Sequence, residues 1–177
     1  MIEVEVKTRI NDPKLAERSI IEMGAVPIGI ETQADTYYSA PFRDFAETDE
    51  ALRVRVQDNK YFLTYKGPKI DGISKTRKEY EIEVNDADIL GNILSSLKFT
   101  PVATIVKKRK KYRLGDFIIS LDDVRKLGSF MEIEISVQDS KSHEEKVESV
   151  FRLFEKLGIS RDESIRKSYL EMMLEMS

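Results

Sequence analysis

The chain has 177 residues, of which 41% are hydrophobic and 34% are charged, and its net charge is only −3. This length and composition predict one soluble globular domain with a full core. The near balance of charge argues against a general nucleic-acid coat, which needs a net basic surface. The absence of cysteine and the single histidine, His143, exclude disulfides, thiolate sites and histidine-rich metal sites. Any metal must therefore be bound by oxygen ligands, which favours Mg²⁺ or Mn²⁺.

No apolar run in the sequence approaches the length of a membrane span, and the first residues lack a signal-peptide pattern. We therefore expect a cytoplasmic protein that has neither a membrane nor a nucleic acid as a partner. No linker rich in Gly, Ser or Pro and no internal repeat divides the chain. Residues 1–177 are thus predicted to form a single domain.

The first half of the chain is predicted to contain one helix and several strands. Asp12 can cap the helix, Pro13 suits its first turn and Gly24 can follow its end. Extended segments, which mostly alternate between apolar and polar residues, are predicted at 2–10, 25–38, 51–57, 60–67 and 76–84. Loops or turns are predicted at 39–50, at Asp58-Asn59, and at 67–75, where Gly67-Pro68 stops a strand.

The middle of the second half predicts one helix and three strands. Asn85 or Asp86 can cap a helix within residues 85–99. Strands are predicted at residues 100–114, 115–124 and 128–137.

The C-terminal part predicts two further helices. Ser142 and Glu145 fit a capping box before a helix that ends near Leu157. A last helix is predicted over residues 164–175, with one apolar face formed by Ile165, Tyr169 and Met172 or Met173. The whole order of elements predicts an α+β fold with a mainly antiparallel sheet.

Charged side chains share one face of several predicted strands. The polar row of the first strand holds Glu3, Glu5, Lys7 and Arg9. Equivalent rows in later strands hold Arg53, Arg55, Arg77, Glu79, Glu81, Glu83, Glu132 and Glu134. Such a face usually lies against water, because antiparallel sheets often have one wet side. Since these rows are charged rather than merely polar, a sheet curled into a barrel with the charges inside is a second interpretation.

A barrel of that kind would have a lumen with charges of both signs. Burying so many charges is unfavourable unless they pair or bind ions. Lys and Arg bind phosphate oxygens, while carboxylates hold the metal ion that bridges those oxygens. Such a lumen therefore suits a polyanion together with its metal.

A series of motifs resembles a known family. The run E-V-E-V-K from Glu3 to Lys7 matches an ExExK signature, and QADTYY, TDEALRVRV, FLTYKGP, TRKEYEIEV, VKKRKKYRL, ISLDDV and LGSFMEIEI follow in order. This order resembles the CYTH family, also called triphosphate tunnel metalloenzymes, and is most similar to its class IV adenylyl cyclase (CyaB-like) group. The resemblance implies a closed antiparallel β-barrel of about eight strands, with a charged lumen and helices packed outside.

The resemblance also implies roles for individual residues. The acids that match metal-binding positions are Glu3, Glu5, Asp122, Glu132 and Glu134. The bases that match triphosphate-binding positions are Lys7, Arg53, Arg55, Lys66, Arg77, Lys107 and Arg109, with Lys107 chosen over Lys108 by strand parity. Glu5, Lys7 and Glu134 are the expected catalytic residues. For Glu79 and Glu81 the simplest expectation is pairing with tunnel bases.

The function implied is a metal-dependent enzyme that binds a small-molecule triphosphate such as ATP, with Mg²⁺ or Mn²⁺. The leading reaction is adenylyl cyclase, which converts ATP to cyclic AMP and pyrophosphate. One alternative is a triphosphatase acting on tripolyphosphate, a nucleoside triphosphate or thiamine triphosphate. Another is a module that binds a polyphosphate without catalysis. Because the family's cyclases favour dimers, a homodimer is expected.

Overall fold

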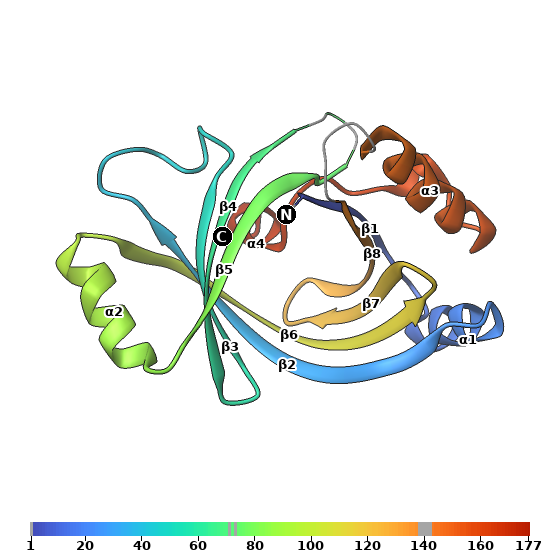
Figure 1. Cartoon of the computed structure of the whole chain (residues 1–177), viewed down its shortest axis with the longest axis horizontal. Coiled ribbons are helices and arrows are strands. Elements are labelled where there is room, and N and C mark those ends of the chain that lie inside the picture. The colour runs from blue at the N-terminus through green and yellow to red at the C-terminus, as the bar shows by residue number, and fades with distance from the viewer. Residues whose placement is uncertain (1, 71, 73, 138–142) are drawn as a thin grey trace.

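Eight antiparallel strands close into a barrel in the computed structural model, which describes the chain except residues 1, 71, 73 and 138–142 (Figure 1). The strands are β1 (Ile2–Arg9), β2 (Val26–Ser39), β3 (Ala51–Gln57), β4 (Lys60–Lys69), β5 (Arg77–Val84), β6 (Thr100–Leu114), β7 (Phe117–Val124) and β8 (Gly128–Val137). Their order around the barrel is β1-β5-β4-β3-β2-β6-β7-β8. The predicted α+β fold with a closed β tunnel is confirmed.

The charged rows face the inside of the barrel, so the second interpretation of the pattern is the right one. On β1, Val4 and Val6 belong to the outer hydrophobic core, whereas Lys7 points the other way and is also fully buried. On β7 and β8, Asp122 and Glu132 are only 2% and 4% exposed. Arg9, in the same row as Lys7, and Glu83 of β5 are exceptions, because both are exposed; Arg9 donates a hydrogen bond to a loop carbonyl.

Helices cover the outside of the barrel on two opposite sides, while the last, short helix lies at the cavity inside the barrel (Figure 1). They are α1 (Pro13–Glu22), α2 (Ala87–Ser96), α3 (His143–Lys156) and α4 (Tyr169–Glu175), with a short 3₁₀ helix, η2 (Arg161–Glu163). Phe151 and Phe154 of α3 pack in one core with β1 and β8 side chains, while Leu90 and Leu94 of α2 pack over β3 and β4. None of the helices in the described chain combines the length and hydropathy needed to cross a membrane.

Helix starts follow the predicted caps where these can be compared. The Asp12 carboxylate accepts hydrogen bonds from the Lys14 and Leu15 amides, and Asp86, rather than Asn85, caps α2. The predicted capping box at Ser142 lies outside the described residues.

The prediction that Gly67-Pro68 stops a strand was wrong, since β4 continues to Lys69. The pairing of β4 with β5 becomes irregular between Lys66 and Lys69, and Lys69 is then opposite Arg77. An irregularity of this kind can accommodate a proline within a strand, because no hydrogen bond between the strands requires the amide hydrogen that proline lacks. The extension brings Lys69 to Asp49.

The last helix begins later than predicted, at Tyr169 instead of residue 164. Ser168 caps α4 in a capping box with Glu171. The spacing of apolar residues, on which the prediction of this helix rests, does not reveal this start. The residues before it pair with β1 instead, because the Ile165 amide donates to the Lys7 carbonyl at 2.7 Å. This contact places α4 against the barrel interior.

Candidate functional site in the tunnel

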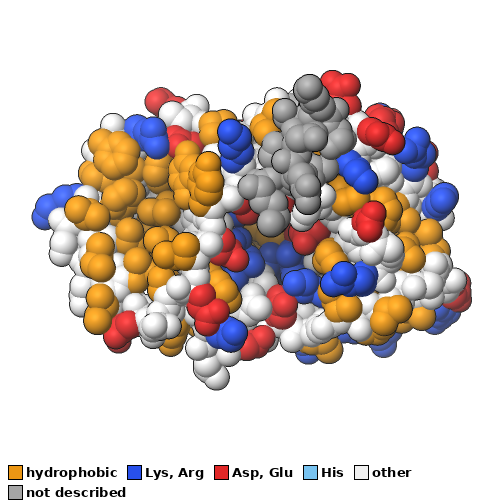
Figure 2. Space-filling view, viewed as in Figure 1, with side chains coloured by type: hydrophobic (Ala, Val, Ile, Leu, Met, Phe, Trp, Pro, Cys, Tyr) orange, Lys and Arg blue, Asp and Glu red, His pale blue; other side chains and the backbone are white. Residues whose placement is uncertain are grey.

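The barrel encloses a cavity of about 510 Å³. Figure 2 shows it as a central hollow with acidic and basic side chains inside. All of the predicted site residues line it except Lys7 and Asp122, which are buried beside it. Lys107 lines the cavity whereas Lys108 is exposed outside, so strand parity placed this pair correctly. The roles of these residues stay predictions.

Arg53 and Arg55 on β3 are held by one carboxylate, Asp35 on β2. The Arg55 Nε and Nη2 atoms donate to the two Asp35 carboxylate oxygens at 2.7 and 2.8 Å, and Arg53 Nη1 lies 3.7 Å from Asp35 Oδ2. Burial alone would raise the pKa of Asp35, but the two arginines hold that pKa well below its ordinary value. Asp35 is therefore ionised and orients both guanidinium groups.

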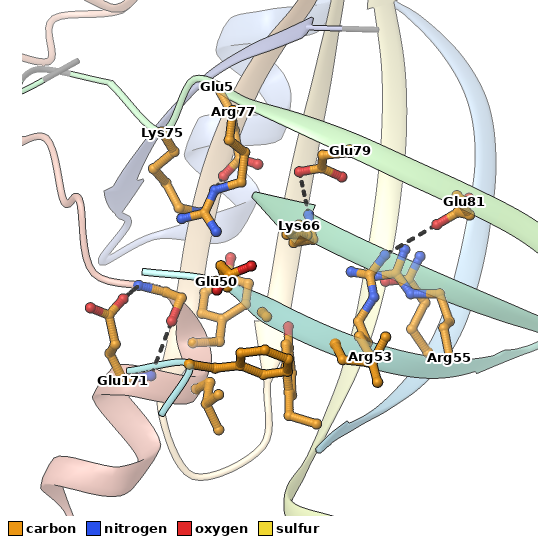
Figure 3. A pocket seen from close by; sticks show the side chains of 18 of the residues that line it. Glu5, Glu50, Arg53, Arg55, Lys66, Lys75, Arg77, Glu79, Glu81 and Glu171 are labelled. Carbon is orange, nitrogen blue, oxygen red and sulfur yellow. Dashed lines mark hydrogen bonds and ion pairs between the residues drawn. The ribbon is translucent and has the colours of Figure 1, made fainter. Parts of the chain in front are cut away.

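Acids on β5 pair with further cavity bases, as expected for Glu79 and Glu81 (Figure 3). Lys66 Nζ donates to Glu79 at 2.5 Å, and Arg53 Nη2 donates to Glu81 at 3.2 Å. Burial lowers the pKa of Lys66, and nearby Arg53 lowers it further. Arg77 lies 3.7 Å from Asp49, at the other end of this row. Strands β3 to β5 thus contribute one group of bases, each paired with a carboxylate.

A second cluster joins β6, β7 and β8 around Arg109. Its Nε and Nη2 atoms donate to the two Asp122 oxygens at 2.7 and 2.6 Å, and Nη2 also pairs with Glu132. Lys107 Nζ lies 3.5 Å from Asp122. Burial would raise the pKa of Asp122, but Lys107 and Arg109 keep it below its ordinary value. Asp122 and Glu132, two of the predicted metal ligands, are thus engaged by Arg109.

The remaining acids of the predicted metal set share facing rows of β1 and β8, and one of them, Glu5, pairs with Lys75. Glu5 and Glu134 are directly opposite each other on β1 and β8, and Glu3 follows on the same row. Within the described residues, neither Glu3 nor Glu134 forms an ion pair within 4.0 Å. Burial, followed by the Glu3 and Glu5 charges, raises the pKa of Glu134 to about 7.

This group fits a hard divalent cation by its chemistry. In the described part of the chain, no three acidic side chains stand close enough to enclose a metal by themselves. Mg²⁺, however, is usually held by one or two carboxylates together with water and substrate phosphates. Opposed carboxylates such as Glu5 and Glu134 repel each other unless a cation lies between them. Glu134, which has no basic partner within 4.0 Å in the described residues, and the facing Glu5 therefore suit Mg²⁺ or Mn²⁺.

Lys7 lies beside the cavity, under the N-terminal end of α4. Its Nζ atom donates to the Lys167 carbonyl and lies 4.2 Å from the Tyr169 ring centroid. Burial and the charge of Lys75 lower the pKa of Lys7 to about 7. The Tyr169 hydroxyl in turn donates to Asp122 Oδ2 at 2.8 Å. Through Tyr169, the C-terminal helix thus contacts both Lys7, a predicted catalytic and triphosphate-binding residue, and Asp122, a predicted metal ligand.

Comparison with known proteins gives the family. The CYTH domain profile matches residues 1–169. The chain belongs to the CYTH family.

The relatives of this CYTH chain have two kinds of name. A protein of Methanocaldococcus jannaschii named "Putative adenylate cyclase MJ0240" is 43% identical over 172 residues, which are 97% of this chain and 98% of that protein. The "Inorganic triphosphatase" of Acetivibrio thermocellus is 39% identical over 79 residues, 45% of this chain and 47% of that protein. The solved structure of the PH1819 protein from Pyrococcus horikoshii has a TM-score of 0.92 and 40% identity, and the match covers 99% of each chain.

Three CYTH tunnel residues escaped the sequence reasoning. The sequence analysis assigns no role to Asp35 beyond its place in the motif QADTYY, although Asp35 shares strand parity with the buried Gln33 and Tyr37. Tyr169 was expected on an apolar helix face; it does pack in a hydrophobic cluster, but its hydroxyl also reaches Asp122. Lys75 lies in a predicted loop, where no alternation can indicate which way a side chain points.

Proposed function

We propose that this chain is a divalent-metal-dependent enzyme that binds a nucleoside triphosphate in its tunnel, with adenylyl cyclase as the leading reaction. The observation that carries the proposal is that one cavity holds both preorganised bases and a pair of facing acids, of which Glu134 has no basic partner within 4.0 Å among the described residues. Arg53, Arg55 and Lys66 are fixed on one side, and Glu5 and Glu134 oppose each other on the other. In a metal-bound triphosphate, the negative phosphate oxygens complement the bases and the metal ion complements the acids.

The residues of the chain would act mainly by binding and orientation. Phosphoryl and nucleotidyl transfer need charge neutralisation and alignment more than covalent participation. The cavity arginines and lysines supply fixed positive charge that needs little reorganisation when charge develops on the phosphates. Glu3, Glu5 and Glu134 would hold Mg²⁺ or Mn²⁺, and such a cation would neutralise phosphate charge and activate the attacking oxygen.

In the cyclase reaction, the ribose 3′ oxygen forms a bond to the α-phosphorus while the bond to the β-phosphate oxygen breaks. Pyrophosphate leaves and the 3′ hydroxyl loses its proton. Support for a nucleoside comes from the cavity lining, which includes Tyr38, Phe45, Leu52, Val102 and Leu174 besides the charged side chains. Apolar and aromatic surface of this kind suits a base and ribose better than it suits a bare polyphosphate.

A triphosphatase is the second candidate, since water can attack a terminal phosphorus in the same tunnel. The match to the Acetivibrio relative, which carries that name, covers only 45% of this chain, while the match to the relative named "Putative adenylate cyclase MJ0240" covers 97%. The third candidate is a polyphosphate-binding module without turnover. The homodimer also stays a prediction, which light scattering in solution tests.

Product analysis tests the proposal. The purified protein is incubated separately with ATP and with tripolyphosphate, each with Mg²⁺ and with Mn²⁺, and the products are resolved. Cyclic AMP with pyrophosphate is the expected result. Orthophosphate without cyclic AMP assigns the triphosphatase reaction, and binding without any product assigns the module. The Glu5→Gln variant, folded by circular dichroism, controls for contaminating activity because it should abolish metal-dependent turnover.

A further inference from the structure

Lys75 enters the tunnel from the segment between β4 and β5, beside Glu5 and Arg77 (Figure 3). Its backbone is fixed, because the Lys75 amide donates to the Glu5 carbonyl at 2.9 Å. The neighbouring Thr76 carbonyl accepts from Ile70 at 2.8 Å, and the buried hydroxyls of Ser74 and Thr76 are hydrogen bonded to each other. The chain is thus built to hold this lysine next to β1.

The Lys75 ammonium group lies among carboxylates of the predicted metal set. Nζ forms an ion pair with Glu5 Oε1 and lies 3.6 Å from Glu132 Oε1, and the side chain is 12% exposed. The Lys75 ammonium charge thus faces two carboxylates at once. A resident cation therefore neutralises Glu5, one of the three acids that the proposed function gives to the metal.

We infer that Lys75 is an internal counter-ion that pairs with the proposed metal ligand Glu5 in the free protein and transfers to a phosphate oxygen when metal and triphosphate enter together. The inference rests on the proposed function. A divalent cation at Glu5 would repel an ammonium ion at contact distance from the same carboxylate. The flexible four-carbon stem allows Nζ to move while the backbone stays fixed by its hydrogen bonds.

The consequence is that metal ion and triphosphate should bind together and not separately. Free metal ion binds weakly because it must displace Lys75 with no new partner for the ammonium group. Metal that arrives with a triphosphate brings that partner, because the phosphate oxygens accept the displaced ammonium. The tunnel would thereby select the metal–triphosphate complex over either component alone.

Calorimetry with MnCl₂ alone, and with tripolyphosphate alone in EDTA, tests the inference without any turnover. Lys75→Met should bind Mn²⁺ at least about tenfold tighter than the wild type, since the competing charge is gone. The same variant should bind metal-free tripolyphosphate several-fold more weakly. Lys75→Arg should keep the weak wild-type Mn²⁺ affinity, and Lys78→Met, which removes an exposed lysine of β5, should match the wild type in both titrations.

Unchanged or weaker Mn²⁺ binding by Lys75→Met overturns the inference, because a merely structural lysine would give that result. If Lys75→Met does not fold, Lys75→Gln removes the same charge and keeps a donor for Glu5. A wild type that turns over triphosphate while Lys75→Met shows unchanged Mn²⁺ affinity refutes only the counter-ion role. A wild type that binds neither metal nor tripolyphosphate, separately or together, refutes the proposed function and this inference with it.

Discussion

Replacing Asp35 by asparagine should destabilise the protein and strengthen metal-free tripolyphosphate binding at the same time. The carboxylate is 2% exposed and accepts two hydrogen bonds from Arg55, at 2.7 and 2.8 Å, with Arg53 at 3.7 Å. Removing one partner of a buried ion pair typically costs about 3–5 kcal/mol, because the other charge stays buried. The Arg55 side chain is 13% exposed to the cavity, so solvent offsets part of this loss and we expect about 3 kcal/mol.

Urea unfolding at pH 7, followed by circular dichroism, measures this change as a lower midpoint with an unchanged slope. Calorimetry then measures tripolyphosphate affinity, which should rise because the phosphates no longer compete with Asp35 for the two guanidinium groups. The matched control is Asp123→Asn, which removes an exposed carboxylate of β7 and should change stability by less than about 0.5 kcal/mol. A midpoint for Asp35→Asn equal to that of the control would refute the anchoring role of Asp35.

The same variant should show a specific dependence on pH. Arg55 and Arg53 hold the folded-state pKa of Asp35 below its unfolded value, which is about 3.9. A carboxylate shifted in this direction contributes stability that is fully present above the unfolded pKa and is lost as pH falls further. The stability difference between wild type and Asp35→Asn should therefore be constant near neutral pH and shrink below about pH 4.

Three further changes test other parts of the tunnel. Arg55→Ala should weaken tripolyphosphate binding at least about tenfold by calorimetry, as expected for the loss of a charged contact, and unchanged affinity would remove Arg55 from the site. Tyr169→Phe should lower the unfolding free energy by about 1.5–3 kcal/mol in urea, because the hydrogen bond to the Asp122 carboxylate is lost while the ring remains; an unchanged midpoint would show that this bond is not stabilising. Burial and neighbouring acids raise the folded pKa of Glu134 from 4.5 to about 7, so wild-type stability should fall as pH rises between these values. Glu134→Gln should remove that fall in metal-free urea titrations from pH 5 to 8, and an identical pH profile in both proteins would contradict the shift.

Sequence alternation was sufficient to orient the strands because a strand has a period of two residues. Once Glu5 was assigned to the lumen, Lys7 had to share its row, and the structure buries Lys7 completely. The same rule separated Lys107 from Lys108 in a run of basic residues. Alternation could not show whether the sheet closes into a barrel. Whether a charged face lies against water or inside a barrel depends on contacts between strands that are distant in the sequence, such as β1 and β8. The resemblance to a known family supplied that step.

The missed features depend on local structure that has no period. Lys75 reaches Glu5 only because a loop amide is hydrogen bonded to the Glu5 carbonyl, a contact over 70 positions of sequence. The start of α4 was misplaced because apolar spacing continues back to Ile165, whereas the Ser168–Glu171 capping box marks the true start. Asp35 lies in β2, a strand of 14 residues. Its side-chain partners are two arginines of the next strand, β3. In each case a side chain gains its role from a partner that the sequence does not place beside it.

The ion pairs of the ligand-free tunnel explain why metal and polyphosphate should bind together. Every arginine and lysine that lines the cavity pairs with a carboxylate: Arg53, Arg55, Lys66, Lys75, Arg77, Lys107, Arg109 and Lys111. This pairing makes the buried charges tolerable, but it means that an incoming anion must exchange with acids that are already bound. A single phosphate can replace the carboxylate partners of only a few bases, whereas a chain of phosphates can engage several bases at once. The displaced carboxylates then carry uncompensated charge, which favours a divalent cation, and by thermodynamic reciprocity the cation must strengthen polyphosphate binding by the same factor.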